Sequence, residues 1–129
     1  MLTGVKFLTE LDLTPVIGSD ANWKLVSDFH CLLSFDNKPD KLVIVPTGFI
    51  TDLATTPWFV RLSFPQADGK WDDAAAMHDY LYSGYGYTTR KEADDAFYFG
   101  VLAGGGKKLT AWLMWAAVRV FARSHWEAP

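Results

Sequence analysis

The residues of this chain with the greatest capacity for chemistry are Asp52, His78, Asp79 and Asp94. One imidazole with two or three carboxylates suits zinc, manganese or another transition ion, whereas calcium prefers more oxygen ligands. A zinc or manganese ion held by Asp52, His78 and Asp94 would activate a water molecule for hydrolysis. In this hypothesis His78 and Asp79 are the catalytic residues, and Asp79 orients a ligand or acts as a base.

The same side chains also suit a buried network that does no chemistry. His78 would then bond to Asp52 or Asp94, and Arg90 would neutralise Asp79 or Asp94 through a bidentate contact. Networks of this kind fix the packing of a loop on helices. The residues alone leave both interpretations open, and we prefer the network because the candidate ligands are scattered along the sequence.

His78 and Asp79 lie in the stretch from Ala74 to Tyr82, which otherwise has the composition of a buried helix. Residues three and four apart share a helix face, so Ala75, His78 and Tyr82 form one stripe. Asp79 lies about 100° further round the helix. The two residues can therefore flank one site but cannot easily bond to each other, and we expect His78 inside the protein or in a cleft.

Strands in the first half and helices in the second must position these residues. Apolar alternation predicts strands within residues 2–13 and 23–35, with the clearest alternation at Phe29, Cys31 and Leu33. The β-branched run at 42–45 is the strongest strand. Helices are predicted over residues 58–62, from 71 or 72 to 82, from 90 to about 103 and from 107 or 108 to about 123. The third opens with a Thr89/Glu92 capping box. The prediction is a single α+β domain over residues 1–129. A small antiparallel sheet (about 1–50) precedes a loop and three main helices (about 51–124).

The composition excludes several classes of protein. Half of the 129 residues are hydrophobic and 16% are aromatic, which favours a folded domain over a disordered chain. The net charge of -3 provides no basic footprint, so no nucleic-acid partner is predicted. The single Cys31 excludes an intramolecular disulfide and is expected to be a buried, inert thiol. No window reaches the roughly 20 apolar residues of a membrane span, so no integral membrane segment is predicted.

The last predicted helix combines apolar and basic residues: Trp112, Trp115, Val118 and Phe121 with Lys107, Lys108, Arg119 and Arg123. Such a helix can lie on a membrane surface. We prefer a core helix with a basic exposed edge, because Leu109, Leu113 and Ala116 extend its apolar stripe. Aromatic side chains on the surface are good interface anchors. The candidates are Tyr80, Tyr85, Tyr87, Trp58 and Trp126.

Four motifs in this order resemble the family called domain of unknown function 1353. They are Pro46-x-Gly48-Phe49-x-Thr51-Asp52-Leu53-Ala54-x-x-Pro57, Ala75-x-x-His78-Asp79-Tyr80-Leu81-Tyr82, Arg90-x-x-Ala93-Asp94-x-x-Phe97 and Ala117-Val118-Arg119-x-Phe121. The resemblance covers about residues 42 to 123, and its motif residues are Asp52, His78, Asp79, Arg90, Asp94 and Arg119. Arg90 and Arg119 are assigned to the structural network. Trp58-Phe59 departs from the family pattern, in which a basic residue follows Pro57.

Members of that family are small proteins of bacteriophages and prophages, so the resemblance implies a phage origin without a settled activity. Our preferred interpretation is a virion or tail-assembly component that binds other phage proteins, or itself, through its aromatic surface. It would reside in the cytoplasm of the bacterial host or be incorporated in the virion. The alternative is a metal-dependent hydrolase that acts on the bacterial cell wall, with Asp52, His78 and Asp94 at its site.

Overall fold

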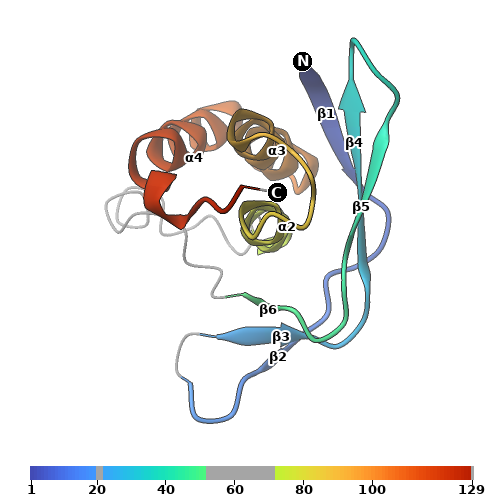
Figure 1. Ribbon diagram of the computed structural model, residues 1–129, viewed down its shortest axis with the longest axis vertical. Helices are drawn as coiled ribbons and strands as arrows, with labels where there is room; N and C mark the ends of the chain where they lie inside the picture. The colour runs from blue at the N-terminus through green and yellow to red at the C-terminus, as the bar shows by residue number, and fades with distance from the viewer. Residues whose placement is uncertain (20–21, 52–71, 129) are drawn as a thin grey trace.

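The computed structural model describes residues 1–19, 22–51 and 72–128, in which an N-terminal region of strands precedes three α-helices (Figure 1). The strands are β1 (Leu2–Phe7), β2 (Leu13–Pro15), β3 (Trp23–Leu25), β4 (Phe29–Phe35), β5 (Lys41–Val45) and β6 (Ile50–Thr51). The helices are α2 (Asp72–Tyr82), α3 (Arg90–Ala103) and α4 (Lys108–Phe121), followed by the short 3-10 helix η1 (Arg123–His125). The predicted α+β class is confirmed.

The strands form two three-stranded antiparallel sheets within the described residues, ordered β1-β4-β5 and β2-β3-β6. The first sheet buries one face, because Phe29, Cys31 and Leu33 alternate with less buried residues along β4. Cys31 pairs with Val43 of β5. Burial raises the pKa of the Cys31 thiol, in agreement with the predicted inert cysteine. A single small sheet was expected, and the separate pairing of β2, β3 and β6 was missed because these strands have only two or three residues each.

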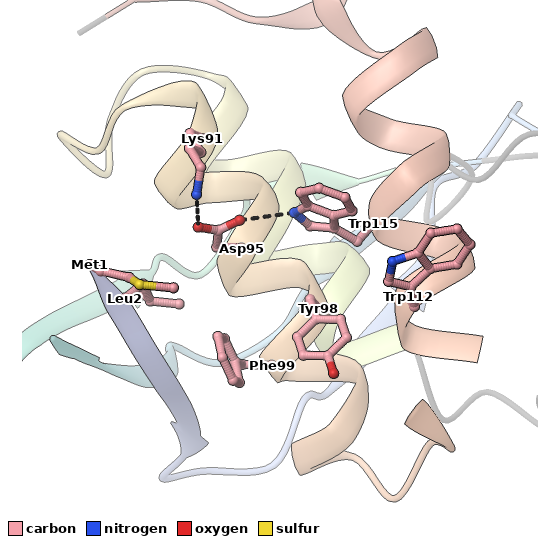
Figure 2. Close-up of a pocket in the computed structure, with 8 residues that line it drawn as sticks. All are labelled: Met1, Leu2, Lys91, Asp95, Tyr98, Phe99, Trp112 and Trp115. Atoms are coloured by element: carbon pink, nitrogen blue, oxygen red, sulfur yellow. Dashed lines mark hydrogen bonds and ion pairs between the residues drawn. The ribbon is translucent and has the colours of Figure 1, made fainter. Parts of the chain in front are cut away.

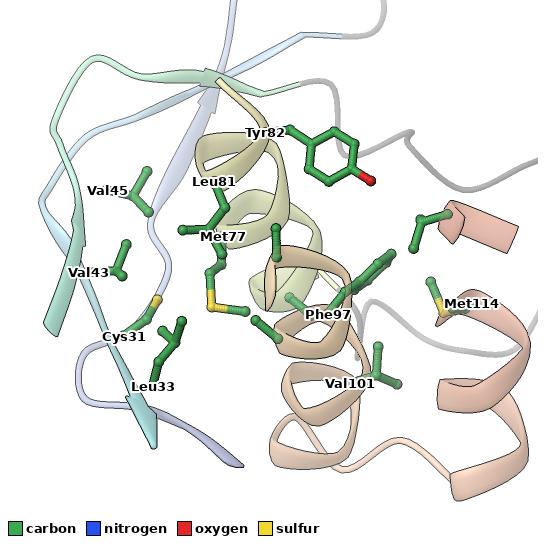
Figure 3. Packing of buried hydrophobic residues seen from close by; sticks show 14 of the residues in the cluster. Cys31, Leu33, Val43, Val45, Met77, Leu81, Tyr82, Phe97, Val101 and Met114 are labelled. Atoms are coloured by element: carbon green, nitrogen blue, oxygen red, sulfur yellow. The ribbon is translucent and has the colours of Figure 1, made fainter. Parts of the chain in front are cut away.

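Helix α3 is the central helix, since it packs against α2, α4 and β1. Figure 3 shows the core between the first sheet and the helices, with Val43 and Val45 on one side and Met77, Phe97 and Val101 on the other. Gly100 of α3 permits the close approach of α2, because a Cβ atom there would lie 2.9 Å from the Cβ of Ala74. Ala74 and the two alanines that follow it on α2 have no exposed surface.

Helix boundaries follow capping chemistry. The predicted capping box at the start of α3 is present: the Thr89 hydroxyl accepts from the Glu92 amide, and the Glu92 carboxylate accepts from the Thr89 amide. Helix α4 ends at Phe121, two residues before the predicted end, and the chain continues as η1. The helix predicted at residues 58–62 lies outside the described residues. None of the described helices has the length and apolar character needed to cross a membrane.

Candidate functional site: a buried polar cluster between three helices

The three helices enclose a buried cluster made of His78, Tyr82, Arg90, Asp94 and Arg119. His78 and Tyr82 come from the shared stripe of α2, and both bond to the same oxygen of Asp94 on α3. His78 Nε2 lies 2.8 Å from Asp94 Oδ1, and the Tyr82 hydroxyl donates to Oδ1 over 2.5 Å. His78 and Asp94 have no exposed surface. The His78–Asp94 contact of the network interpretation is therefore present.

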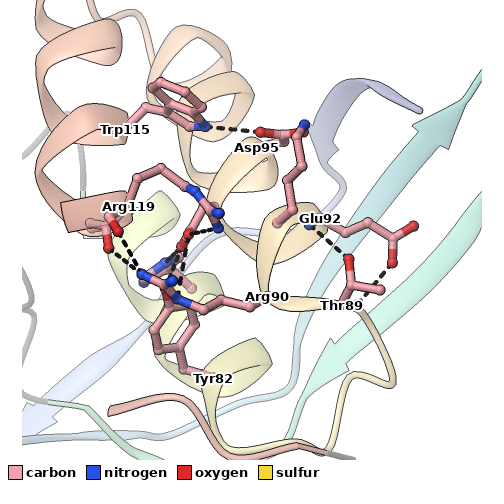
Figure 4. Close-up of polar contacts among 11 residues, drawn as sticks. Tyr82, Thr89, Arg90, Glu92, Asp95, Trp115 and Arg119 are labelled. Atoms are coloured by element: carbon pink, nitrogen blue, oxygen red, sulfur yellow. Dashed lines mark hydrogen bonds and ion pairs between the residues drawn. The ribbon is translucent and has the colours of Figure 1, made fainter. Parts of the chain in front are cut away.

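Two arginines complete the surroundings of this carboxylate (Figure 4). Arg119 of α4 donates from Nη1 to Asp94 Oδ2 over 2.8 Å. Arg90 Nε lies 3.9 Å from the same oxygen and donates to the Tyr82 hydroxyl over 3.1 Å. Arg90 Nη2 also donates to the backbone carbonyls of Val118 and Arg119, at 3.0 and 2.8 Å. Arg90 therefore joins the beginning of α3 to the end of α4, where its guanidinium adds to the Ala122 amide as a donor to the Val118 carbonyl.

The charges of the buried cluster follow from these contacts. Burial would raise the pKa of Asp94, but hydrogen bonds from His78, Tyr82 and Arg119 outweigh burial and hold it below its usual value. Burial lowers the pKa of His78 despite the nearby Asp94 charge. Burial and the bond to Asp94 raise the pKa of Tyr82, so its hydroxyl keeps its proton. At neutral pH the cluster contains an ionised Asp94, a neutral His78 and two arginine cations.

The tautomer of His78 is determined by Asp94. An ionised carboxylate can only accept hydrogen bonds, so the Nε2 atom of His78 must carry the ring proton. The Nδ1 atom then presents a lone pair, and it is buried without a hydrogen-bond partner among the described residues. A neutral imidazole held in this way by a carboxylate is the arrangement in which histidine binds a metal ion or accepts a proton.

Asp79 points away from this cluster, as its position on the helix predicted. Its Oδ2 atom accepts a hydrogen bond from the Thr51 hydroxyl at the end of β6. This bond ties α2 to the second sheet, and no bond between His78 and Asp79 is formed within the described part of the structure. Asp52 follows Thr51 directly in sequence but lies outside the described residues, so its predicted role as a metal ligand stays a prediction.

The hydrogen bonds within the buried cluster limit which of its side chains could bind a metal ion. Both oxygens of Asp94 already accept hydrogen bonds, and two guanidinium groups stand beside them. These contacts fit Asp94 as a partner that orients His78 rather than as a direct ligand. His78 Nδ1, which no other described residue contacts by a hydrogen bond, has the lone pair that a ligand needs. Within residues 1–19, 22–51 and 72–128, no group of three or more His, Cys, Asp or Glu side chains is placed to bind an ion.

A second feature lies on the outer side of α3 and α4. This aromatic pocket is open to the surface, has a volume of about 290 Å³ and is lined mainly by apolar atoms of Tyr98, Phe99, Trp112 and Trp115. Met1 and Leu2 form another wall, as Figure 2 shows. Sequence reasoning named the two tryptophans only as part of an apolar helix. Their meeting with Tyr98 and Phe99 depends on how α3 and α4 pack, which residue spacing alone does not determine.

Polar groups border the aromatic pocket at one side. Asp95 Oδ1 accepts a hydrogen bond from the indole nitrogen of Trp115 at 2.9 Å, and Asp95 Oδ2 accepts one from the Lys91 ammonium at 2.7 Å. Both contacts are drawn in Figure 2. Asp94 and Asp95 thus connect α3 to α4 on two different faces, one inside the protein and one at the pocket.

Comparison with known proteins gives one match. The model of the family described as "Protein of unknown function (DUF1353)" matches residues 23–118, most of the chain. This range contains every residue of the buried cluster except Arg119, which follows its last position directly. No curated protein and no solved structure matches the chain.

Proposed function

The chain belongs to this family of proteins of unknown function, and from that premise we propose that it is a bacteriophage virion or tail-assembly component. The phage context is what the family resemblance implies. The observation that carries the proposal is the contrast between two features. Both oxygens of the buried Asp94 accept hydrogen bonds from the protein's own side chains, whereas the aromatic pocket on α3 and α4 is open to the surface. Trp, Tyr, Phe and Met are the side chains that concentrate at the centres of protein interfaces.

The buried cluster suits this role because it stabilises the surface that a partner would contact. Asp94 joins α2 and α4 to α3, and Arg90 attaches the end of α4 to the beginning of α3. Two helices held in this way present their aromatic side chains in a fixed geometry. A preorganised surface loses less conformational entropy when a partner binds.

Mass spectrometry of purified particles of a phage that encodes this chain tests the proposal, combined with deletion of its gene. We expect the protein in the particles, or incomplete particles when the gene is deleted. An assembly protein that leaves the finished particle would give the second result alone. Absence of the protein from particles, together with normal particle yield and morphology after deletion, would reject the proposal.

A second candidate function is a metal-dependent hydrolase that acts on the bacterial cell wall. The observation that favours it is the Nδ1 atom of His78, which is buried without a hydrogen-bond partner among residues 1–19, 22–51 and 72–128. A zinc or manganese ion would supply Lewis acidity for hydrolysis. His78 would bind it, Asp94 would orient the His78 ring, and Asp52 would be a further ligand. Asp79, bonded to Thr51, would position a ligand or accept a proton.

Elemental analysis of protein purified without chelators tests this second function. Stoichiometric zinc or manganese that is lost in Asp52→Ala and His78→Ala, but kept in Asp95→Ala, would support it. Asp95 is the matched control because it is a carboxylate of the same helix region bonded to Trp115 and Lys91. Absence of metal from the unmodified protein, with no peptidoglycan hydrolysis after zinc or manganese is added, would reject it.

A further inference from the structure

The aromatic pocket has the size and lining of a site for one side chain of a partner protein. Its volume of about 290 Å³ is just below that of pockets that enclose small molecules, about 300–1,000 Å³. It is also open to the surface, so a small ligand would remain partly in water. A large apolar side chain that projects from another protein would fill it without being enclosed. The rings of Tyr98, Trp112 and Trp115 would then provide edge-to-face or stacking contacts.

Trp112 is the most accessible ring of the pocket, with 53% of its surface exposed. Leu109, three residues earlier on α4, is 62% exposed, although the sequence interpretation placed it in the internal stripe. The buried stripe of α4 consists instead of Ala111, Met114, Ala117 and Val118. Helix α4 therefore exposes the apolar side chains of Leu109 and Trp112 next to the pocket. Exposed apolar surface of this kind is typical of a site that a partner covers.

The charge beside the pocket indicates which charged residues should flank the apolar side chain of a partner. Lys108, Trp112 and Trp115 are spaced four and three residues apart, so they share one face of α4. Lys91, on the α3 side, is already paired with Asp95. Lys108 does not line the pocket, but it lies one turn before Trp112 on the same face of α4. Within the described residues Lys108 forms no ion pair or hydrogen bond, whereas both oxygens of Asp95, the carboxylate in the lining, already accept hydrogen bonds. The unpaired charge next to the pocket on α4 is thus positive, although the whole chain carries a net charge of -3.

We propose that the aromatic pocket docks a partner-protein segment in which a phenylalanine or a similarly large apolar side chain is flanked by carboxylates. The apolar side chain enters between Trp112, Trp115 and Tyr98, and a carboxylate pairs with Lys108. This inference rests on the proposed role in assembly, since it names the surface and the partner chemistry that such a role needs.

Titration of the ¹⁵N-labelled full chain with short capped peptides tests the inference by NMR. The probes are acetyl-Glu-Phe-Glu-amide, acetyl-Lys-Phe-Lys-amide and acetyl-Glu-Ala-Glu-amide at millimolar concentration and low salt. We expect the first peptide to shift the indole N–H signals of Trp112 and Trp115. It should bind at least about threefold more tightly than the basic peptide, because opposite charges at a surface attract at low ionic strength. The alanine peptide should leave these signals in place.

Matched variants separate the apolar and the electrostatic parts. Trp112→Ala should abolish the response, whereas Leu109→Ala, one turn away and outside the pocket lining, should keep it. Lys108→Glu should remove the preference for the acidic peptide, whereas Lys107→Glu changes the net charge equally but lies off the Trp112 face. Equal binding of acidic and basic peptides, or equal effects of the two lysine variants, would overturn the role of Lys108.

Other outcomes overturn the docking inference as a whole. These are no response at the pocket to any peptide, binding of N-acetylphenylalaninamide as tight as that of the acidic peptide, or a response to phosphatidylglycerol vesicles alone. The second indicates a small-molecule site, and the third indicates a lipid surface. Presence of the protein in phage particles without a pocket response would reject this inference and leave the assembly role in place. A pocket response with no assembly phenotype would reject only the assembly role.

Discussion

Asp94 and Asp95 are neighbours in α3, yet they belong to two regions with opposite properties. Asp94 is fully buried, accepts hydrogen bonds from three side chains and is flanked by two arginines. Asp95 keeps 12% of its side-chain surface exposed and bonds to Trp115 and to an exposed lysine. One step of about 100° around the helix separates the two carboxylates. The difference shows that burial and partners, rather than residue type, decide what a carboxylate does here.

The buried cluster and the aromatic pocket also differ in what their residues contribute to the protein. Residues of the buried cluster hold α2, α3 and α4 together, and a change there leaves charges without partners. Residues of the aromatic pocket face water, so a change there removes contact surface at little structural cost. We therefore expect substitutions to divide by region: large losses of stability in the buried cluster, and small losses with altered binding in the pocket.

Asp94→Asn should produce the largest effect. The variant keeps the size of the side chain but removes the charge that compensates Arg90 and Arg119. Loss of one partner of a buried ion pair costs about 3–5 kcal/mol, and we expect about 3 because both arginines are partly exposed. Urea unfolding at pH 7 measures it. Asp95→Asn is the matched control, for which about 1 kcal/mol is expected. Equal losses in the two variants would break the contrast between the regions.

The second prediction concerns pH and also belongs to the buried cluster. Burial lowers the pKa of His78 in the folded state, so between that pKa and about 6.5 the unfolded chain binds more protons. Stability should therefore fall as pH is lowered below about 6.5, by at most about 1.4 kcal/mol per pH unit from this residue. At lower pH, Asp94 adds a loss that begins below its unfolded pKa, because its folded pKa is lowered.

The His78→Gln variant isolates the histidine contribution. Its amide can still donate to Asp94 but does not titrate. Urea unfolding of both proteins from pH 7.5 to 5 should give a steeper fall for the unmodified protein than for the variant. Parallel curves would mean that the folded state accepts a proton on His78 as readily as the unfolded chain, contrary to the expected effect of its burial.

Much of the fold could be predicted from sequence because local rules specify it. Thr89 and Glu92 define the start of α3 through hydrogen bonds to nearby amides. Strand β4 shows a clear alternation of buried and less buried residues. Strands β2, β3 and β6 were harder to predict, since their pairing depends on contacts between distant residues and leaves only a short local pattern. The outward position of Leu109 depends on how far α4 is rotated about its axis against α3. The sequence does not determine this rotation, because α4 has apolar residues on several of its faces.

The sequence predicted which residues belong to the buried cluster better than it predicted the contacts between them. Helical spacing placed His78 inside and Asp79 on a different face, and both placements hold. Tyr82 was recognised only as a stripe residue, although its hydroxyl bonds to Asp94. Arg90 was expected to pair with a carboxylate, but its hydrogen bonds to the end of α4 follow from the antiparallel packing of two helices. Spacing within one helix contains no information on that packing.

On the pocket side, Trp115→Phe should lower stability by about 1 kcal/mol, because it removes one hydrogen bond to a carboxylate that retains Lys91 and access to water. Trp112→Phe is the control, since this ring is exposed and the expected change lies within about 0.5 kcal/mol. Thermal unfolding of the two variants measures the difference. A larger loss of stability for Trp112→Phe than for Trp115→Phe would mean that Trp112 stabilises the fold. The expected difference between the buried cluster and the pocket would then not hold for this ring.

Lys91→Ala should have the smallest effect. The Lys91–Asp95 pair joins positions i and i+4 of α3, and the lysine side chain is 62% exposed. Exposed pairs of this kind contribute about 0.3–0.5 kcal/mol, and salt screens them. Urea unfolding at low and high salt should therefore show a small loss that disappears at high salt. For Arg119→Met the loss should persist, because the Asp94 carboxylate that Arg119 contacts is fully buried and poorly screened. A loss for Lys91→Ala that resists salt would mean that Asp95 is as dependent on its cation as Asp94.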